Sequence, residues 1–230
     1  MKAKWPKKVP SLTRAEQEIK NDFMKYWHEV LPRRYSVVEK FNHGFPVKYA
    51  TGRRVLEIGA GLGEHIGYEN LNAVDYYAME LRPEMAEVIK NRFPNVQVIV
   101  GDCQKHSSFP DHYFDRIIAI HVLEHLPNLP EALREVRRVL KTDGKFLIVI
   151  PCEGGTLYSF ARFISAKRIF KKRYGEDYDW YIKTEHINLP DEIEEELKHY
   201  FTINKRSYFP FLIPSVQANL VIGLECAPRV

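Results

Sequence analysis

The sequence is poor in cysteine. Its three cysteines, Cys103, Cys152 and Cys226, are widely spaced and form no Cys-x-x-Cys pair. An odd, scattered set excludes a disulfide framework and a cysteine-based zinc site, and it indicates reduced thiols. No apolar run approaches the roughly 18 residues that a membrane span needs. The basic N-terminal segment also lacks the apolar core of a signal peptide. We therefore expect a soluble, cytoplasmic protein.

A strong excess of charge of one sign is also missing. The 34 basic residues are nearly matched by 30 acidic ones, which gives a net charge of +4. This balance carries no strong signal for nucleic-acid binding. Hydrophobic residues make up 45% of the chain and charged residues 28%, as is typical of a folded protein. A chain of this length fits one α/β domain, so we treat residues 1–230 as a single domain.

Short apolar runs alternate with helical segments from Arg53 onward. Helices are predicted at 83–93, 130–140 and 191–199, and strands at 55–58, within 72–81, and at 96–100, 115–120, 145–150, 201–208 and 219–226. Strands that alternate with helices of this length are typical of parallel βαβ units. The pattern predicts an α/β fold with a doubly wound, mostly parallel seven-stranded sheet and a final antiparallel strand.

Four regions follow from this pattern: an N-terminal helical cap (1–50), a core (53–151), an insertion (152–190), and a C-terminal helix with strands (191–230). In the cap we expect a helix over 11–31, ended by Pro32, a second helix over 35–41, and a loop at Asn42-His43-Gly44. The insertion holds a basic aromatic helix (158–174) and an acidic aromatic loop (175–181). Asp143-Gly144 is predicted to turn into the strand at 145–150.

A glycine-rich turn follows the first predicted strand. Gly59, Gly61 and Gly63 alternate there, and such glycines let a ligand approach the backbone at the start of a helix. Glu80 ends the next strand near the spacing at which an acid meets ribose hydroxyls. Glu64 stands where a dinucleotide fingerprint has its third glycine, and its charge would repel a pyrophosphate. The turn therefore predicts an adenosyl ligand without phosphates.

Five segments occur in a characteristic order: VLEIGAGLG, AMELRPEM, Gly101-Asp102-Cys103, FDRIIAIHVLEHLPN and LREVRRVLKTDGKFLIVIP. Through them residues 53–151 resemble the class I S-adenosylmethionine-dependent methyltransferases, most closely the enzymes that act on small molecules, quinones, lipids and sugars. The resemblance implies methyl transfer from S-adenosylmethionine to a small-molecule acceptor, with S-adenosylhomocysteine as product. Two other functions stay open: a non-catalytic partner subunit of the same fold, and a nicotinamide-dependent oxidoreductase.

The resemblance also implies the cofactor-binding residues, which are Glu57, Gly59, Ala60, Gly61, Gly63, Glu80, Leu81, Asp102, Cys103, Ile120 and His121. In such enzymes Glu57 and the glycine backbone hold the amino acid moiety. Glu80 would bind the ribose hydroxyls, and Leu81 would pack on the adenine. Asp102 and the amide of Cys103 would meet the adenine ring, while Ile120 and His121 would lie beneath the methionine portion.

Three histidines are the candidate catalytic residues. His121 and His125 flank Glu124 in the segment His-Val-Leu-Glu-His, and His186 follows in the insertion. A histidine there can act as a general base, because its ordinary pKa lies near neutrality, or it can simply satisfy backbone groups. Some related quinone and RNA methyltransferases carry Glu-x-x-Glu-His at this place and bind a divalent metal. His121 departs from that pattern, so we expect no metal.

The insertion bears on the acceptor. Its basic residues (Arg162, Lys167, Arg168, Lys171, Lys172 and Arg173) alternate with Phe160, Phe163, Ile169 and Phe170. The helix over 158–174 can bind an anionic acceptor, contact an anionic membrane, or form a solvated face over a core stripe. Tyr178, Trp180 and Tyr181 can stack on a ring or pack the insertion. We rank a sugar or glycolipid precursor first, another small metabolite or quinone second, and RNA or protein third.

Overall fold

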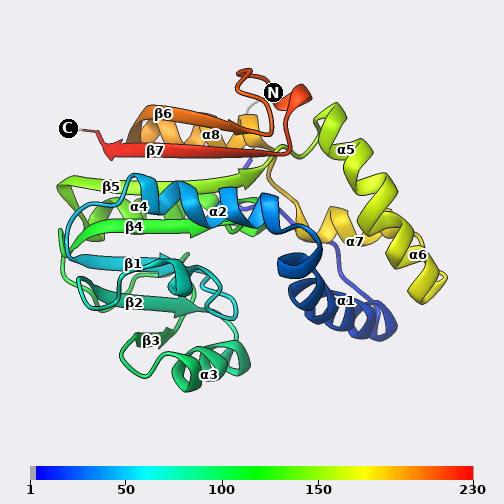
Figure 1. Ribbon diagram of the computed structural model, residues 1–230, viewed down its shortest axis with the longest axis horizontal. Helices are drawn as coiled ribbons and strands as arrows, with labels where there is room; N and C mark the ends of the chain where they lie inside the picture. The colour runs from blue at the N-terminus through cyan, green and yellow to red at the C-terminus, as the bar shows by residue number, and fades with distance from the viewer. Residues whose placement is uncertain (1–3, 230) are drawn as a thin grey trace.

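The computed structural model describes residues 4–229, except for the side chains of residues 28–33. Its seven strands form one sheet in the order β3-β2-β1-β4-β5-β7-β6 (Figure 1). The strands are β1 (Arg54–Ile58), β2 (Asp75–Glu80), β3 (Gln97–Val100), β4 (Phe114–Ile120), β5 (Leu140–Pro151), β6 (Phe201–Phe209) and β7 (Val221–Pro228). Strands β1 to β5 pair in parallel, and β7 is antiparallel to both neighbours. The predicted mostly parallel sheet with an antiparallel C-terminal strand is confirmed.

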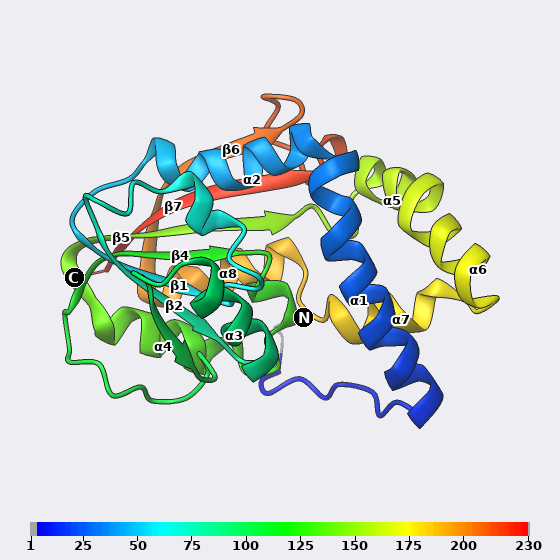
Figure 2. The same cartoon turned by 60° about the horizontal axis from the view of Figure 1, so that its bottom comes forward.

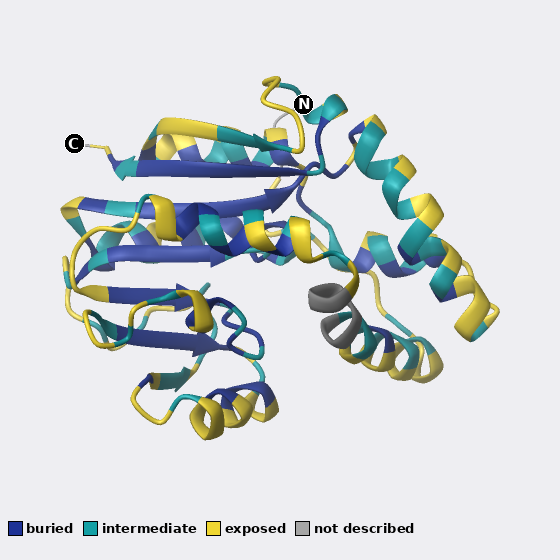
Figure 3. Cartoon of the chain, viewed as in Figure 1, coloured by how far each residue is buried: buried dark blue, intermediate teal, exposed yellow. Residues whose placement is uncertain are grey.

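Helices cover both faces of this sheet (Figure 2). They are α2 (Ser36–Lys48), η1 (His65–Tyr68), α3 (Pro83–Arg92), α4 (Leu129–Val139) and α8 (Pro190–Tyr200). Alternation along β1 turns Leu56 and Ile58 toward the layer of α4 and α8, while Val55 faces η1 and α3. Phe45 of α2 packs on β5 and β7. The central strands are therefore buried on both faces, as Figure 3 shows.

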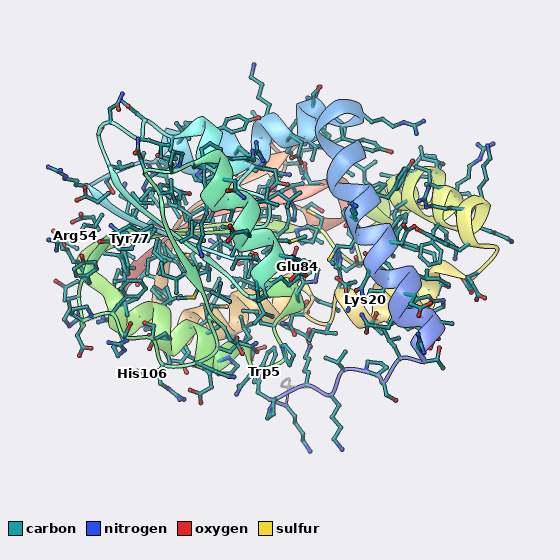
Figure 4. The ribbon with its side chains drawn as sticks, turned by 90° about the horizontal axis from the view of Figure 1, so that it is seen from below. Trp5, Lys20, Arg54, Tyr77, Glu84 and His106 are labelled. Carbon is teal, nitrogen blue, oxygen red and sulfur yellow. The ribbon has the colours of Figure 1, made fainter. Side chains whose placement is uncertain are left out.

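A group of helices lies beyond the carboxyl ends of β4 and β5 (Figure 1). It comprises α1 (Arg14–Arg34), α5 (Thr156–Arg162), the π-helical turn η3 (Phe163–Lys167), α6 (Arg168–Tyr174) and α7 (Tyr178–Glu185). Phe23 of α1 is its centre, with ring centroids 5.0 Å from Phe170 and 5.2 Å from Tyr181. Lys20 of α1 also forms an ion pair with Glu185 of α7 (Figure 4). Of the two alternatives for Tyr178 and Tyr181, burial in this cluster supports packing.

Two expectations about the N-terminal helices are wrong. Helix α1 continues past Pro32 to Arg34, directly before α2 begins. The expected loop at residues 42–44 lies inside α2. Polar side chains are accommodated there because the Asn42 amide donates to Glu39 at 3.0 Å, and His43 Nε2 lies 3.2 Å from the same carboxylate. Contacts three and four residues apart are those that a helix supports.

Two later boundaries also differ from expectation. Residues 178–181 of the expected acidic loop begin α7, because the Asp177 carboxylate accepts from the Asp179 N–H at 3.1 Å and caps the helix. Strand β5 begins at Leu140, so Asp143-Gly144 lies inside it. The remaining predicted helices and strands are confirmed to within a few residues at their ends.

Candidate functional site

The glycine-rich turn leaves β1 at the carboxyl edge of the sheet. Gly59, Gly61 and Gly63 have φ angles of 65°, 57° and 80°, in the left-handed region that glycine adopts without strain. A Cβ atom on Gly59 would lie 2.5 Å from a methyl group of Val122. Glycine is therefore required at this position both by its backbone conformation and by its neighbour.

Glu80, the last residue of β2, holds this turn in place. Its carboxylate is 3% exposed and accepts a hydrogen bond from the Gly61 N–H at 2.9 Å. The other oxygen accepts from the backbone N–H and Nε of Arg82, at 3.1 and 3.0 Å. Leu81, by contrast, is 60% exposed. A buried acid beside an exposed apolar side chain offers acceptors to hydroxyl groups and a surface to a flat ring.

The loop after β3 lies against the same place. The Gly101 N–H donates to the Glu80 carbonyl at 3.0 Å. Asp102 Oδ1 accepts from the backbone N–H and the side-chain amide of Gln104, both at 3.0 Å. Burial raises the pKa of the Cys103 thiol to about 12, so this thiol stays protonated and is no nucleophile. Predicted cofactor contacts from β1, β2 and β3 thus lie at one edge of the sheet.

Glu57 lies beneath the turn rather than in it. Its carboxylate is buried and accepts a hydrogen bond from the Tyr76 hydroxyl at 2.8 Å. Burial raises the pKa of Glu57 to about 8. Glu64 is placed differently, because its carboxylate accepts from the Leu62 N–H at 3.0 Å. An acid that already occupies a donor of the turn suits a ligand without phosphates.

Histidines gather beyond the end of β4, next to Ile120. His121 has a left-handed backbone (φ 52°), its N–H donates to the Val149 carbonyl at 2.9 Å, and its Nδ1 lies 3.2 Å from Glu124 Oε1. The rings of His125 and His186 have centroids 5.1 Å apart. The structure therefore brings all three predicted histidines around the buried Glu124, although 60 residues of sequence separate two of them.

Glu124, His125 and His186 are the described residues whose atoms are close enough together to hold a metal ion. One ligand atom of each lies within 4.8 Å of the others. Glu124 Oε2 is buried and has no hydrogen-bond partner among the described residues. Each histidine is oriented through Nδ1, His125 by the Glu185 carbonyl at 2.7 Å and His186 by the Glu153 carboxylate at 2.8 Å.

A hollow of about 310 Å³ opens beside His186. It is lined by Glu153, Arg162, Asp179, Ile182, Lys183, His186 and Leu189. Glu153 was missed by sequence reasoning because a lone acid after a strand carries no motif. Glu153 follows the end of β5 at Pro151. Ligand-binding residues of open parallel sheets often follow the carboxyl ends of the strands, and this position was the signal that could have identified Glu153.

The fold is that of a Rossmann-like α/β protein, and these contacts make the carboxyl ends of β1, β2 and β3 a candidate nucleoside site. The residues suit an adenosyl group, because a buried carboxylate and an exposed apolar side chain stand together at the end of β2.

Comparison with known proteins agrees. The family model for the methyltransferase domain matches residues 56–148. The sterol 4-C-methyltransferase of Caenorhabditis elegans is 34% identical over 103 residues, which are 40% of this chain and 29% of that protein. The first four curated relatives are covered over 29% to 45% of their length.

Two crystal structures share the fold. A protein from Pyrococcus horikoshii OT3 superposes with a TM-score of 0.66 at 20% identity, over 89% of this chain and 99% of that one. A TehB-like S-adenosylmethionine-dependent methyltransferase from Corynebacterium glutamicum gives 0.63 at 17% identity, over 91% and 98%. Residues 56–148 are therefore a methyltransferase domain of the class that uses S-adenosylmethionine as its cofactor.

Replacing Glu80 tests the nucleoside site. We expect the parent protein to bind S-adenosylhomocysteine in the micromolar range, about −8 kcal/mol, and Glu80→Ala to weaken binding by about 1.5–3 kcal/mol, the scale of hydrogen bonds to a charged group. Isothermal titration calorimetry measures both. Glu84→Ala, on the exposed side of α3 (Figure 4), is the matched control and should bind like the parent. Equal affinity of Glu80→Ala and the parent contradicts the assignment.

Glu57 predicts a pH dependence of stability. Because its pKa is raised to about 8 in the folded protein, the native state keeps a proton that the unfolded chain releases above about pH 4.5. Stability therefore falls as pH rises through this window, by at most about 1.4 kcal/mol per pH unit.

Glu57→Gln removes this titration. Between pH 5.5 and 7.5 we expect the parent to lose about 2 kcal/mol more free energy of unfolding than the variant, measured by urea denaturation. Glu176→Gln, at an exposed position, should follow the parent. Parallel profiles for the parent and Glu57→Gln would show that Glu57 is ionised in the native state.

Proposed function

We propose that the protein transfers the methyl group of S-adenosylmethionine to a small-molecule acceptor, which binds at the histidine-rich end of β4. The observation that carries this proposal is the hydrogen bond from the Gly61 N–H to the buried Glu80 carboxylate, in a chain whose residues 56–148 match the methyltransferase domain. The cofactor supplies the methyl group as an electrophilic sulfonium carbon. The work left to the chain is to align the acceptor and to exclude water.

The polar groups around the hollow support an acceptor that is a sugar, a glycolipid precursor or another anionic metabolite. Arg162 and Lys183 bring two basic groups to its wall beside the carboxylates of Glu153 and Asp179, and Arg side chains bind carboxylate and phosphate groups in a two-pronged geometry. Arg162 is held by the Glu153 carboxylate, so its direction is fixed before any ligand arrives. The helix over 158–174, for which a membrane contact is predicted, contributes Arg162 to this hollow.

The catalytic role of His121, His125 and His186 stays a prediction. Their common position supports an acceptor-side role: His186 lines the hollow, and His121 follows Ile120 at the strand end. For His125 and His186 we also propose that they bind a metal ion. A carbonyl can only accept, so the Glu185 carbonyl fixes the proton on His125 Nδ1 and leaves Nε2 as a lone pair.

Together with Glu124, these two histidines form a carboxylate and two imidazoles. This donor set suits Zn²⁺, Mn²⁺ and similar ions. Ligand atoms each about 2.1 Å from one tetrahedral metal lie about 3.4 Å apart, so atoms within 4.8 Å of one another need to close by at most about 1.4 Å. We therefore propose a divalent metal at this cluster, against the expectation from sequence.

Label transfer tests the proposed activity. Protein with S-adenosylmethionine labelled on its methyl group is expected to methylate at least one member of a panel of sugar phosphates, glycolipid precursors and quinols. Glu80→Ala should reduce that rate about tenfold or more at sub-saturating cofactor, in proportion to its weaker binding. Tight binding of S-adenosylhomocysteine without transfer to any member would favour the non-catalytic alternative.

Cobalt tests the metal cluster without any acceptor. Chelator-treated protein titrated with Co²⁺ should develop visible absorption at one equivalent. His125→Gln and His186→Gln should each weaken Co²⁺ binding at least tenfold, and Glu153→Gln by about tenfold through the orientation of His186. His106→Gln, an exposed histidine outside the cluster, should match the parent. If His125→Gln and His186→Gln bind Co²⁺ as the parent does, the metal assignment is wrong.

A further inference from the structure

One side of the helix from Thr156 to Tyr174 has no protein partner in the described structure. α5, η3 and α6 follow one another directly, and the π-helical turn keeps residues 160, 163, 164, 168, 171 and 172 on the exposed side. Ala166 and Phe170 face the other way, into the aromatic cluster around Phe23. The helix is therefore anchored through one side and presents a second, independent face.

This exposed face is amphipathic along its length. Phe160, Phe163 and Ile164 stand at its first half, each more than half exposed. Arg168, Lys171 and Lys172 follow in the second half. Residues 156–175 contain no acidic residue. Sequence reasoning left open whether the phenylalanines form a core stripe; Phe170 does, whereas Phe160 and Phe163 lie in solvent.

The basic residues divide into two groups. Arg162 is paired with Glu153, Lys167 with Asp179, and Arg173 with Asp22. Arg168, Lys171 and Lys172 are exposed and form no ion pair with the described side chains, which exclude those of residues 28–33. The first group holds the helix in the fold, and the second leaves an unbalanced positive charge at its surface.

A second apolar element lies beside the start of this helix. Phe211, Leu212 and Ile213 connect β6 to η4 (Val216–Ala218), and Leu212 is 92% exposed. Asn219, which is fully buried, accepts from the Phe211 N–H at 2.8 Å and donates to the Ile213 carbonyl at 2.8 Å. These bonds hold the loop in one shape with its apolar side chains outward.

The loop and the helix are neighbours. The backbone N–H and hydroxyl of Thr156 donate to the Gln217 side chain at 3.1 and 2.7 Å, and both ribbon views show the β6–β7 connection next to α5 (Figures 1 and 2). Six large apolar side chains thus stand at one end of the molecule, followed by the three exposed cations. Apolar groups beside lysine and arginine are the pattern of a segment that lies in the interface of an anionic membrane.

We propose that this face, defined by Phe160, Phe163, Ile164 and Phe211–Ile213 with Arg168, Lys171 and Lys172, docks the protein on an anionic lipid surface. A second copy of the chain is disfavoured as the occupant, because it would set like charges against each other. One part of this inference rests on the proposed function: the docked face brings a lipid-linked acceptor to the transfer site. Arg162 at the end of α5 lines the hollow beside His186, so a headgroup reaches the transfer site from the docked surface.

Vesicle flotation tests the proposal with the full chain. We expect the parent to float with vesicles of 70% phosphatidylcholine and 30% phosphatidylglycerol at 50 mM salt, and to bind at least tenfold less at 500 mM salt or to phosphatidylcholine alone. Phe163→Asp and Leu212→Asp should each lower binding at least tenfold. Lys171→Glu combined with Lys172→Glu should lower it more than tenfold, at about fivefold for each charge lost.

Val88→Asp is the matched control, because Val88 is 37% exposed on α3, which packs by β2 and β3 at the end of the sheet opposite to β6 and β7; it should float like the parent. All variants should bind S-adenosylhomocysteine unchanged, which shows that they fold and keeps the outcome separate from the proposed methyl transfer. Failure of the parent to float overturns the proposal. So does sedimentation of the parent as a dimer that Leu212→Asp dissociates, because the face then belongs to a second copy.

Discussion

The hydrogen bond from the Gly61 N–H to the Glu80 carboxylate joins the two strands on which the nucleoside site depends. Parallel pairing sets Ile58 opposite Met79, so the turn after β1 and the acid at the end of β2 meet at one edge. The Ala60 N–H adds a bond to the Met79 carbonyl at 3.1 Å. A charged acceptor at 3% exposure binds a backbone N–H strongly, and the turn is thereby fixed in shape before a ligand binds.

A buried ion pair holds the chain behind the turn. Arg116 of β4 is nearly fully buried and donates to both oxygens of Glu69 at 2.9 and 2.8 Å. His65 of η1 lies 3.1 Å from the same carboxylate, and burial lowers the pKa of His65 although Glu69 acts in the opposite sense. A buried arginine is costly unless its hydrogen bonds are met. The segment that follows Gly63 is therefore tied to the middle of the sheet, and the turn is held from both ends.

Sequence periodicity predicted the sheet because each strand of the core carries its own signal. Runs such as Phe146–Ile150 are apolar on both sides, and they could be placed without knowing their neighbours. The glycine turn and Glu80 were found for the same reason: their spacing is local.

What the sequence could not show is contact between distant segments. His186 reaches His125 because the Asn188 amide donates to the carbonyls of Leu123 and Leu126, at 2.7 and 2.8 Å. Residues 42–44 were misplaced because their polar side chains are satisfied by Glu39, a contact that exists only once the helix has formed.

The histidine cluster is built from two parts of the chain. His121, Glu124 and His125 lie within residues 56–148, the segment shared with the methyltransferase family. Glu153 and His186, which complete the cluster and line the hollow, come from the region after that segment. The shared part places Glu124 beyond the end of β4, where its Oε2 has no hydrogen-bond partner among the described residues. The region after β5 then supplies the third histidine, the arginine of the hollow and the exposed helix face. The proposed acceptor side therefore draws on residues outside the matched segment, while the candidate nucleoside site lies within it.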